Sequence, residues 1–438
     1  MITPPAPIPS APPWPHCAHG AAPATDPVGC TGIHVPGHTA CLAHLTDTDR
    51  NTYLASLAPG ADIDHRGTHF TAPLLISLLH ALRDPTTTNL HLGSARFDRA
   101  QFSGDAQFGE AQFSGNAQFG EAQFLGNAGF ERAQFSGNTG FDRARFAGDA
   151  QFGEAQFSGD TWFSRAQFSG HAGFGGTQFS RKAWFEQAQF SGDAWFERAQ
   201  SSGDSGFSGA QFSGDARFAE ARFAVLSWFG PVVCGRGVDL SGAVFEVPVT
   251  LEIAAREVLC VRARWESTAT VRLRHASVDL SHRRTLAEEH HWRAQSAGQP
   301  VPAPGRPPSP RAWRTGPHHP DTDLTPDPED VVATYRQLRK AFEDGTNEPG
   351  AADFYYGEME MRRHDPTGAP FGERGLLHGY WLLSGYGLRA SRALGWLAAA
   401  MLVTIILLMG FGIPNDSPKQ VATGHRAVRR RQGRVCDR

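Results

Sequence analysis

Phenylalanine recurs through the middle of the chain in alternating steps of five and six residues, as in the stretch AQFSGDAQFGEAQF. The series runs from Phe97 to Phe229 and is broken at Ser201. In a helix, two phenylalanines five residues apart would lie about 140° apart around the axis, and the glycine in almost every unit would cost about 1 kcal/mol. In one continuous strand, the alternation of odd and even steps would move the phenylalanines from face to face. Neither regular element fits the pattern.

Short strands separated by tight turns do fit the eleven-residue unit AQFSGDAQFGE. Within AQF, the alanine and the phenylalanine point to one side and the glutamine to the other, and the SGD, SGN and GE pieces contain residues that favour turns. Repetition of strand and turn coils a chain into a β-solenoid with an apolar interior. Because burial of one phenylalanine contributes about 1.5–3 kcal/mol, stacked phenylalanine columns are predicted to be the main support of a mainly β fold.

These residues resemble the motif of the pentapeptide-repeat family, in which a small residue, a polar residue and then leucine or phenylalanine are followed by two more residues. Residues 100–102 and 106–108, both Ala-Gln-Phe, match that motif. The resemblance implies the fold of the family, a right-handed quadrilateral β-helix (β-solenoid). The alternation of five and six residues is similar to the Phe-rich subgroup of the family, and it predicts one extra turn residue on alternate sides.

The clear repeats cover residues 95–229, and the pattern weakens on either side. Residues 61–94 are predicted to form a first coil and a capping helix, because PLLISLLHAL is apolar and the end of a solenoid needs a cover. Residues 230–282 are predicted to be decayed C-terminal coils. The other predicted segments are a Cys/His- and Pro-rich N-terminal segment (1–60), a helix remnant and Pro-rich linker (283–326), a helical hairpin with an interfacial segment (327–392), a transmembrane helix (393–413) and a basic tail (414–438).

The C-terminal quarter of the chain contains the predicted membrane segment. Residues 393–413, ALGWLAAAMLVTIILLMGFGI, carry no charge over about twenty residues, the length of a helix that spans a bilayer. Trp396 stands near one end, where interfacial aromatic residues are common. A buried helix of a soluble core is the alternative, but the sequence offers it no comparable helical partners. The preceding stretch GLLHGYWLLSGYGLRASR is amphipathic and is predicted to lie in the interface.

The charges on the two sides of this segment argue for opposite orientations under the positive-inside rule. Arg389 and Arg392 stand directly upstream and closer, whereas Lys419, Arg426 and Arg429 to Arg431 stand downstream. The N-terminus MITPPAPIPSAPPWPHC has neither the basic start nor the apolar core of a secretory signal. We therefore expect a single-pass membrane protein with a cytoplasmic N-terminal body. The stretches YRQLRKAFEDGTNEPGAADFYYGEMEMRR and SGYGLRASRALGW resemble the C-terminal module of actinobacterial membrane-associated pentapeptide-repeat proteins, which implies membrane association and no established activity.

Cysteine and histidine concentrate near the N-terminus. The set comprises Cys17, His19, Cys30, His34, His38, Cys41 and His44. Zinc takes four Cys or His ligands, and cytoplasmic thiols stay reduced, but the spacing lacks a Cys-x-x-Cys pair. We therefore hypothesise a structural zinc site at Cys17, Cys30, His38 and Cys41. Unliganded side chains and a disulfide stay open as alternatives.

The charge and motif content favours a non-catalytic protein. The formal net charge is −3, so no global charge recruits nucleic acid. A DNA-mimicking topoisomerase inhibitor, known in the family, is an alternative, yet residues 95–229 carry 15 acidic and 11 basic side chains, which interrupt one another. The sequence contains no nucleophile elbow, phosphate-binding loop or zinc-protease helix. We therefore expect no enzyme, but a scaffold or interaction surface for an unidentified protein partner.

In a repeat this regular, the repeated residues form the core and the turns. We therefore expect any binding function to lie in the outward positions that depart from the repeat. The candidate interaction residues are Arg143, Arg145, Trp162, Arg181, Lys182, Trp184 and Trp195. The third hypothesis treats the solenoid as a stalk for a zinc-binding N-terminal module.

Overall fold

The computed structural model describes residues 11–22, 26–226, 228–255, 257–265, 270–275, 286, 288–289, 292, 328–344, 348–365, 370–388 and 390–412. Most of the predicted Pro-rich linker and all of the basic tail lie outside these residues. The chain divides into two compact units, Met1–Gly375 and Leu376–Arg438.

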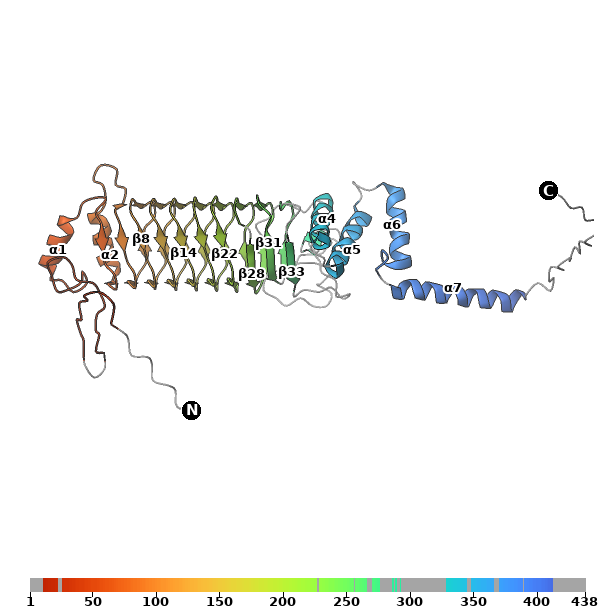
Figure 1. Ribbon diagram of the computed structural model, residues 1–438, viewed down its shortest axis with the longest axis horizontal. Helices are drawn as coiled ribbons and strands as arrows, with labels where there is room; N and C mark the ends of the chain where they lie inside the picture. The colour runs from red at the N-terminus through yellow and green to blue at the C-terminus, as the bar shows by residue number, and fades with distance from the viewer. Residues whose placement is uncertain are drawn as a thin grey trace, which may run out of the picture. The chain divides into compact units, whose positions relative to one another are not determined.

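The first unit contains a β-solenoid whose strands are mostly two residues long and pair in parallel (Figure 1). In the regular repeats each strand pairs with the strand 22 residues further on, as Phe102 does with Phe124. One coil is therefore two eleven-residue units and has four sides, and there are about eight coils. The predicted β-solenoid is confirmed, while its right-handedness stays a prediction.

The four sides are four parallel sheets, numbered here in the order in which a regular coil of the chain meets them. Sheet I consists of β1 (Ile63–Asp64), β4 (Ala95–Arg96), β8 (Ala117–Gln118), β12 (Thr139–Gly140), β16 (Thr161–Trp162), β20 (Ala183–Trp184) and β24 (Ser205–Gly206). Sheet II consists of β2 (His69–Phe70), β5 (Gln101–Phe102), β9 (Gln123–Phe124), β13 (Arg145–Phe146), β17 (Gln167–Phe168), β21 (Gln189–Phe190), β25 (Gln211–Phe212), β28 (Trp228–Cys234), β31 (Thr250–Ala255) and β33 (Thr270–His275).

The remaining two sheets complete each coil. Sheet III consists of β6 (Ala106–Gln107), β10 (Ala128–Gly129), β14 (Ala150–Gln151), β18 (Ala172–Gly173), β22 (Ala194–Trp195), β26 (Ala216–Arg217), β29 (Gly237–Asp239) and β32 (Glu257–Leu259). Sheet IV consists of β3 (His91–Leu92), β7 (Gln112–Phe113), β11 (Gln134–Phe135), β15 (Gln156–Phe157), β19 (Gln178–Phe179), β23 (Gln200–Ser201), β27 (Arg222–Phe223) and β30 (Val244–Phe245).

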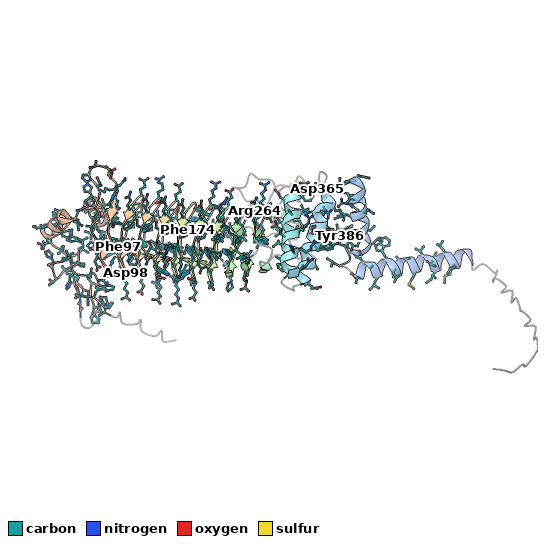
Figure 2. All side chains as sticks on the ribbon, turned by 45° about the horizontal axis from the view of Figure 1, so that its top comes forward. Phe97, Asp98, Phe174, Arg264, Asp365 and Tyr386 are labelled. Carbon is teal, nitrogen blue, oxygen red and sulfur yellow. The ribbon has the colours of Figure 1, made fainter. Side chains whose placement is uncertain are left out.

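Stacked phenylalanines fill the solenoid, as the sequence predicts. Phe97 and Phe174, labelled in Figure 2, are fully buried. Rings one coil apart are parallel and close, with centroids 4.8 Å apart for Phe124 and Phe146, which matches the spacing of paired strands. At the broken position, Ser201 is buried and its hydroxyl forms a hydrogen bond with that of Ser205. A polar pair thus replaces one ring in the column between Phe179 and Phe223.

The five-residue and the six-residue spacings between phenylalanines form different turns at the corners of the coil. The five-residue steps turn through a residue in the left-handed region, as at Arg99 (φ 57°). The six-residue steps contain the predicted extra residue, in most steps an Asp or Asn whose side chain links successive coils. Oδ1 of Asp105 accepts a hydrogen bond from the backbone N–H of Asn127 (2.9 Å), and Oδ1 of Asn127 accepts one from that of Asp149 (3.0 Å). This ladder explains why Asp or Asn recurs at the third position of the SGD and SGN pieces, which the sequence alone suggests only as turn residues.

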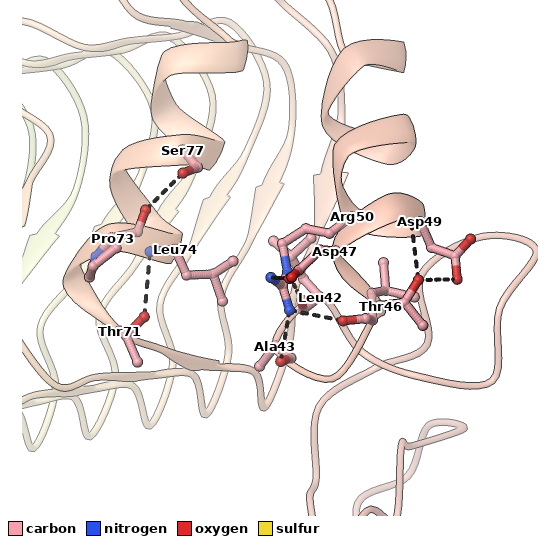
Figure 3. Close-up of polar contacts among 11 residues, drawn as sticks. Leu42, Ala43, Thr46, Asp47, Asp49, Arg50, Thr71, Pro73, Leu74 and Ser77 are labelled. Carbon is pink, nitrogen blue, oxygen red and sulfur yellow. Dashed lines mark hydrogen bonds and ion pairs between the residues drawn. The ribbon is translucent and has the colours of Figure 1, made fainter.

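The N-terminal end of the solenoid carries two short helices, α1 (Asp47–Ser56) and α2 (Ala72–Ala81). Helix α2 occupies the stretch in which a capping helix was expected, and the Thr71 hydroxyl caps its first turn by accepting a hydrogen bond from the N–H of Leu74 (Figure 3). In α1, the hydroxyl of Thr46 accepts a hydrogen bond from the N–H of Asp49 (3.2 Å). Both helices therefore begin after a threonine that serves as the N-cap.

In the first coil, His65 occupies the position that a phenylalanine occupies in later coils. Its backbone N–H donates a hydrogen bond to the carbonyl of Arg96, and in the next coil the N–H of Phe97 donates the equivalent bond to the carbonyl of Gln118. It is fully buried against Phe97, and its Nε2 lies 3.3 Å from the hydroxyl of Tyr53 in α1. Burial lowers the pKa of His65 from 6.5 to about 4, although the charge of Asp64 opposes this.

The buried His65 should make the stability of the protein fall in acid. The unfolded chain binds a proton at His65 below about pH 6.5, whereas the folded chain resists it down to about pH 4. The neutral His65 therefore leaves the free energy of unfolding at its full value above pH 6.5. As the pH falls to about 4, the free energy of unfolding decreases by about 3 kcal/mol. Denaturant titrations of the wild type and His65→Phe at about pH 7.5 and about pH 4 measure it. The exposed His69, replaced by Gln, is the matched control, and an equal acid loss in His65→Phe would contradict the assignment.

Two helices cover the C-terminal end of the solenoid, α4 (Pro328–Asp344) and α5 (Glu348–His364). The hydroxyl of Tyr335 in α4 accepts a hydrogen bond from the N–H of Leu286 (3.0 Å), and Arg262 forms an ion pair with Asp330 (2.7 Å). The carboxylate of Glu288 accepts a hydrogen bond from the backbone N–H of Val261 (2.7 Å). The sequence predicted this hairpin but not its docking onto the last coils.

The second unit contains most of α6 (Phe371–Ser384) and all of α7 (Ala390–Phe411). Polar contacts fix the elbow between the two helices. Nη1 of Arg392 donates a hydrogen bond to the carbonyl of Trp381 (3.1 Å), and Nε1 of Trp396 donates one to that of Leu382 (3.0 Å). Helix α7 covers the predicted transmembrane segment and begins slightly before it, and residue 413 lies outside the described chain.

Candidate metal centre and exposed surfaces

Backbone pairing near the N-terminus brings two cysteines side by side. The N–H of Cys17 donates a hydrogen bond to the carbonyl of Gly32 (2.8 Å), and that of Ala18 donates one to the carbonyl of Cys30 (2.9 Å). A third cysteine, Cys41, starts a single turn of helix-like backbone in which the N–H of His44 donates to the carbonyl of Cys41 (2.9 Å). Residues three apart on such a turn face the same way.

The four side chains Cys17, Cys30, Cys41 and His44 converge, with one ligand atom from each lying within 4.8 Å of all the others. The sulfurs of Cys30 and Cys41 are 3.7 Å apart, and Nδ1 of His44 lies 3.5 Å from the sulfur of Cys17 and 3.4 Å from that of Cys41. A tetrahedral zinc ion would place two sulfurs about 3.8 Å apart and a sulfur and a nitrogen about 3.6 Å apart. The donor set and its spacing therefore fit zinc.

The structure corrects the predicted histidine, because His44 and not His38 joins the three cysteines. His38 lies in the turn before Cys41, where its N–H donates to the carbonyl of Val35 (2.9 Å). The ring of His44 also stacks on that of His19, with centroids 4.1 Å apart. The short spacing Cys41-x-x-His44 was the available signal, since one turn of backbone places the second residue beside the first.

The thiols interact strongly with one another. The hydrogen bond from Cys41, helped by the neighbouring His44, lowers the pKa of Cys30 from 9.0 to about 5. The same hydrogen bond, together with burial and the charge of the Cys30 thiolate, raises the pKa of Cys41. Thiolate is the form that binds metal ions. The sulfur–sulfur distance of 3.7 Å is far beyond that of a disulfide, and both cysteines are free.

Three of the predicted interaction residues meet on and beside sheet I. The half-buried rings of Trp162 and Trp184 lie on successive strands with centroids 6.1 Å apart. The ammonium of Lys182 lies 5.0 Å from the centre of the Trp184 ring. Arg181, at the corner that leads into this sheet, lies 3.7 Å from the carboxylate of Asp160. We call Trp162, Lys182 and Trp184 the tryptophan patch.

The other predicted interaction residues lie elsewhere. Trp195 is on sheet III and stacks on His171, with ring centroids 5.2 Å apart. Arg145 is exposed on sheet II, and Arg143 stands at a corner where it pairs with Glu121 (3.4 Å). The seven residues therefore form no single surface.

Acidic and basic side chains alternate along the corners of the solenoid. Arg99 pairs with Glu121 (2.8 Å) and Arg132 with Glu110 (2.6 Å). This alternation does not favour a DNA mimic, which needs a uniformly negative face. A hollow at one corner is lined by Gly109, Glu110, Glu131, Arg132, Gly153, Glu154 and Gly175. None of these lining residues is a serine, cysteine or histidine that could act as a nucleophile or its base.

Comparison with known protein families identifies the repeats. A family model described as pentapeptide repeats (9 copies) matches residues 92–134, 119–167, 130–178, 152–200 and 185–230. No curated protein and no solved structure gave a match.

Proposed function

Because this chain is a pentapeptide-repeat protein over residues 92–230, we propose that it is a non-catalytic scaffold, anchored in a membrane near its C-terminus, whose solenoid binds a protein partner. The observation that carries the proposal is the exposure of α7. Its residues Ala390–Gly410 are long and apolar enough to span a bilayer, and none of the apolar window is buried. A soluble protein would have to leave this whole surface in water.

The energetic argument for the anchor is direct. Leu402, Ile406 and Met409 are 60%, 58% and 82% exposed, and burial of one such side chain contributes about 1.5–3 kcal/mol. Transfer of α7 into hydrocarbon removes this apolar surface from water, and the helix satisfies its own backbone hydrogen bonds. Trp381 and Trp396 at the elbow suit the boundary between water and lipid.

Helix α6 supports an interfacial position for the elbow. It runs across the direction of α7 (Figure 1), and its side chains Leu376, Leu382 and Leu383 are exposed. If α7 crosses the bilayer, a helix perpendicular to it lies along the surface, where exposed leucines can insert. With Arg392 at that boundary, the positive-inside rule favours a single-pass protein with a cytoplasmic solenoid.

The solenoid provides the binding surface of the proposal. Solenoids offer extended, regular sides to partners, and both ends of this one are covered by helices (Figure 1). On sheet I the outward strand positions carry Gln118 and Gly140 and then the large rings of Trp162 and Trp184. Tryptophan is enriched in protein interfaces relative to the rest of the surface. A protein partner on sheet I is therefore favoured over nucleic acid.

Alkaline carbonate extraction of cell membranes tests the anchor. The full chain is expected to stay with the lipid after the carbonate wash and to enter solution only with detergent, because α7 is held by hydrocarbon and not by a peripheral contact. Release of the full chain by carbonate alone would contradict the membrane anchor. Protease added to the cytoplasmic side should digest the solenoid, and protection there would reverse the proposed orientation.

A second candidate function is a metal-binding N-terminal module carried on the solenoid. The convergence of Cys17, Cys30, Cys41 and His44 favours it. Structural zinc is the proposed ion, because three thiolates and one imidazole form a closed tetrahedral set without a position for substrate.

A further inference from the structure

We propose that zinc bound by Cys17, Cys30, Cys41 and His44 acts as a clasp that holds the N-terminal segment, residues 11–45, over the first coil of the solenoid. Metal occupancy then decides whether this segment, in addition to α1 and α2, covers the first coil. The inference rests on the proposed metal-binding function and adds what binding does to the fold.

The first support is direct contact between the ligand-bearing backbone and the first coil. The N–H of Ile33 donates a hydrogen bond to the carbonyl of Arg66 (2.8 Å), and the hydroxyl of Thr31 donates one to that of Gly67 (3.2 Å). Gly67 has φ +64°, and a Cβ there would lie 2.4 Å from the carbonyl oxygen of Thr31. The contact therefore requires glycine in the coil, and it begins one residue after the ligand Cys30.

Gly32 lies close both to the ligand Cys41 and to the first coil. A Cβ on Gly32 would lie 2.6 Å from Cβ of Cys41 and 3.3 Å from Cα of Thr68. Gly32 is thus wedged between a metal ligand and the first coil. Movement of Cys41 after loss of the metal would change the fit of this backbone against the coil.

The second support is the side chain of Trp14, which precedes the first ligand and is 9% exposed. Its Nε1 donates a hydrogen bond to the carbonyl of Thr31 (2.9 Å). The guanidinium groups of Arg66 and Arg99 lie 4.9 Å and 5.6 Å from the centre of its ring. Trp14 thus reaches two successive coils, and it stands three residues before the ligand Cys17.

The third support is the apolar cover that the clasped segment supplies. Val35, Leu42 and Leu45 are buried and belong to the same core as the phenylalanine columns. Arg50 in α1 donates hydrogen bonds to the carbonyls of Leu42 (3.2 Å) and Leu45 (2.9 Å), so that the residues around His44 are fixed to the helix (Figure 3).

The physical consequence follows from the coupling of metal binding to folding. The segment meets the coil through few hydrogen bonds, and the ligands close two loops whose ordering costs conformational entropy. Metal binding offsets that cost, because the binding free energy of a structural zinc site is folding free energy. Without zinc, the segment is expected to detach and to uncover β1 and β2, the first strands of sheets I and II.

The test uses the full chain in detergent and combines zinc analysis with hydrogen exchange. Wild type and His38→Ala should carry stoichiometric zinc, whereas His44→Ala should lose about 90% or more of it. Chelation of the wild type should speed exchange at the Ile33 amide and at residues 63–70 by about tenfold or more, leave residues 140–200 unchanged, and be reversed by added zinc.

The two proposals fail in different ways. Wild type without zinc after exposure to it would overturn both the metal-binding function and the clasp. Zinc that binds stoichiometrically but whose removal leaves exchange at Ile33 and residues 63–70 unchanged would overturn the clasp alone. Loss of zinc in His38→Ala but not in His44→Ala would overturn the assignment of the fourth ligand.

Discussion

Replacing Leu402 and Ile406 together by arginine is expected to move the protein from the membrane to the soluble fraction. The two side chains are exposed and one helical turn apart on α7, so both charges would stand on the same face near the middle of the span. Each arginine there costs insertion about 2.5–3.5 kcal/mol. The pair should therefore shift the partition by several orders of magnitude, which immunoblots of floated membranes and of the soluble fraction measure.

The matched control keeps α7 apolar by changing the same two residues to valine. This variant should float with the membranes like the wild type. Flotation in a density gradient is needed because aggregated protein also sediments but does not float with lipid. A double arginine variant that still floats and resists carbonate would show that α7 is not what anchors the chain.

Replacing Phe146 by alanine should lower the free energy of unfolding of the solenoid by about 3–5 kcal/mol. Its ring is 1% exposed and lies between Phe124 and Phe168, each with its centroid 4.8 Å away. The coils above and below cannot close the gap, because their spacing is set by hydrogen bonds between paired strands. Denaturant titration measures the loss, and hydrogen exchange should place it in the neighbouring coils, since a solenoid is stabilised by nearest-neighbour contacts.

Arg145 supplies the control for this prediction because it precedes Phe146 on the same strand and points outward. Arg145→Ala should change the free energy of unfolding by less than about 0.5 kcal/mol. Equal losses in the two variants would argue against phenylalanine columns as the main support of the fold.

The spacing of the phenylalanines was enough to predict the solenoid, whereas the ladder of Asp and Asn side chains was missed. The five- and six-residue steps were sufficient for the solenoid, since the inward position of Ala and Phe depends only on alternation within a strand. The sequence also contained the ladder of Asp105, Asn127 and Asp149 as a period of 22 residues. That ladder was missed because SGD and SGN read equally well as isolated turns, and only stacking of the coils gives their side chains a second backbone to bind.

The metal site and the C-terminal hairpin depend on contacts that no local pattern encodes. Among the seven Cys and His residues, His38 was predicted as the fourth ligand, whereas the folded segment brings His44 to Cys17 across 27 residues. Similarly, the hydroxyl of Tyr335 meets Leu286 across 49 residues. Helix periodicity predicted α4 but contained no information about the surface that its apolar stripe would cover.

The sequence by itself determined the coil, its phenylalanine interior and the length of the apolar C-terminal helix, because each follows from spacing over a few residues repeated many times. Only the tertiary structure decided that His44 completes the cysteine cluster, that Trp162 and Trp184 are neighbours while Trp195 lies on another sheet, and that α4 docks on the last coils. The physical reason is that these features arise from packing between segments distant along the chain. Their geometry is set by the stacking of coils and by the covers at the two ends.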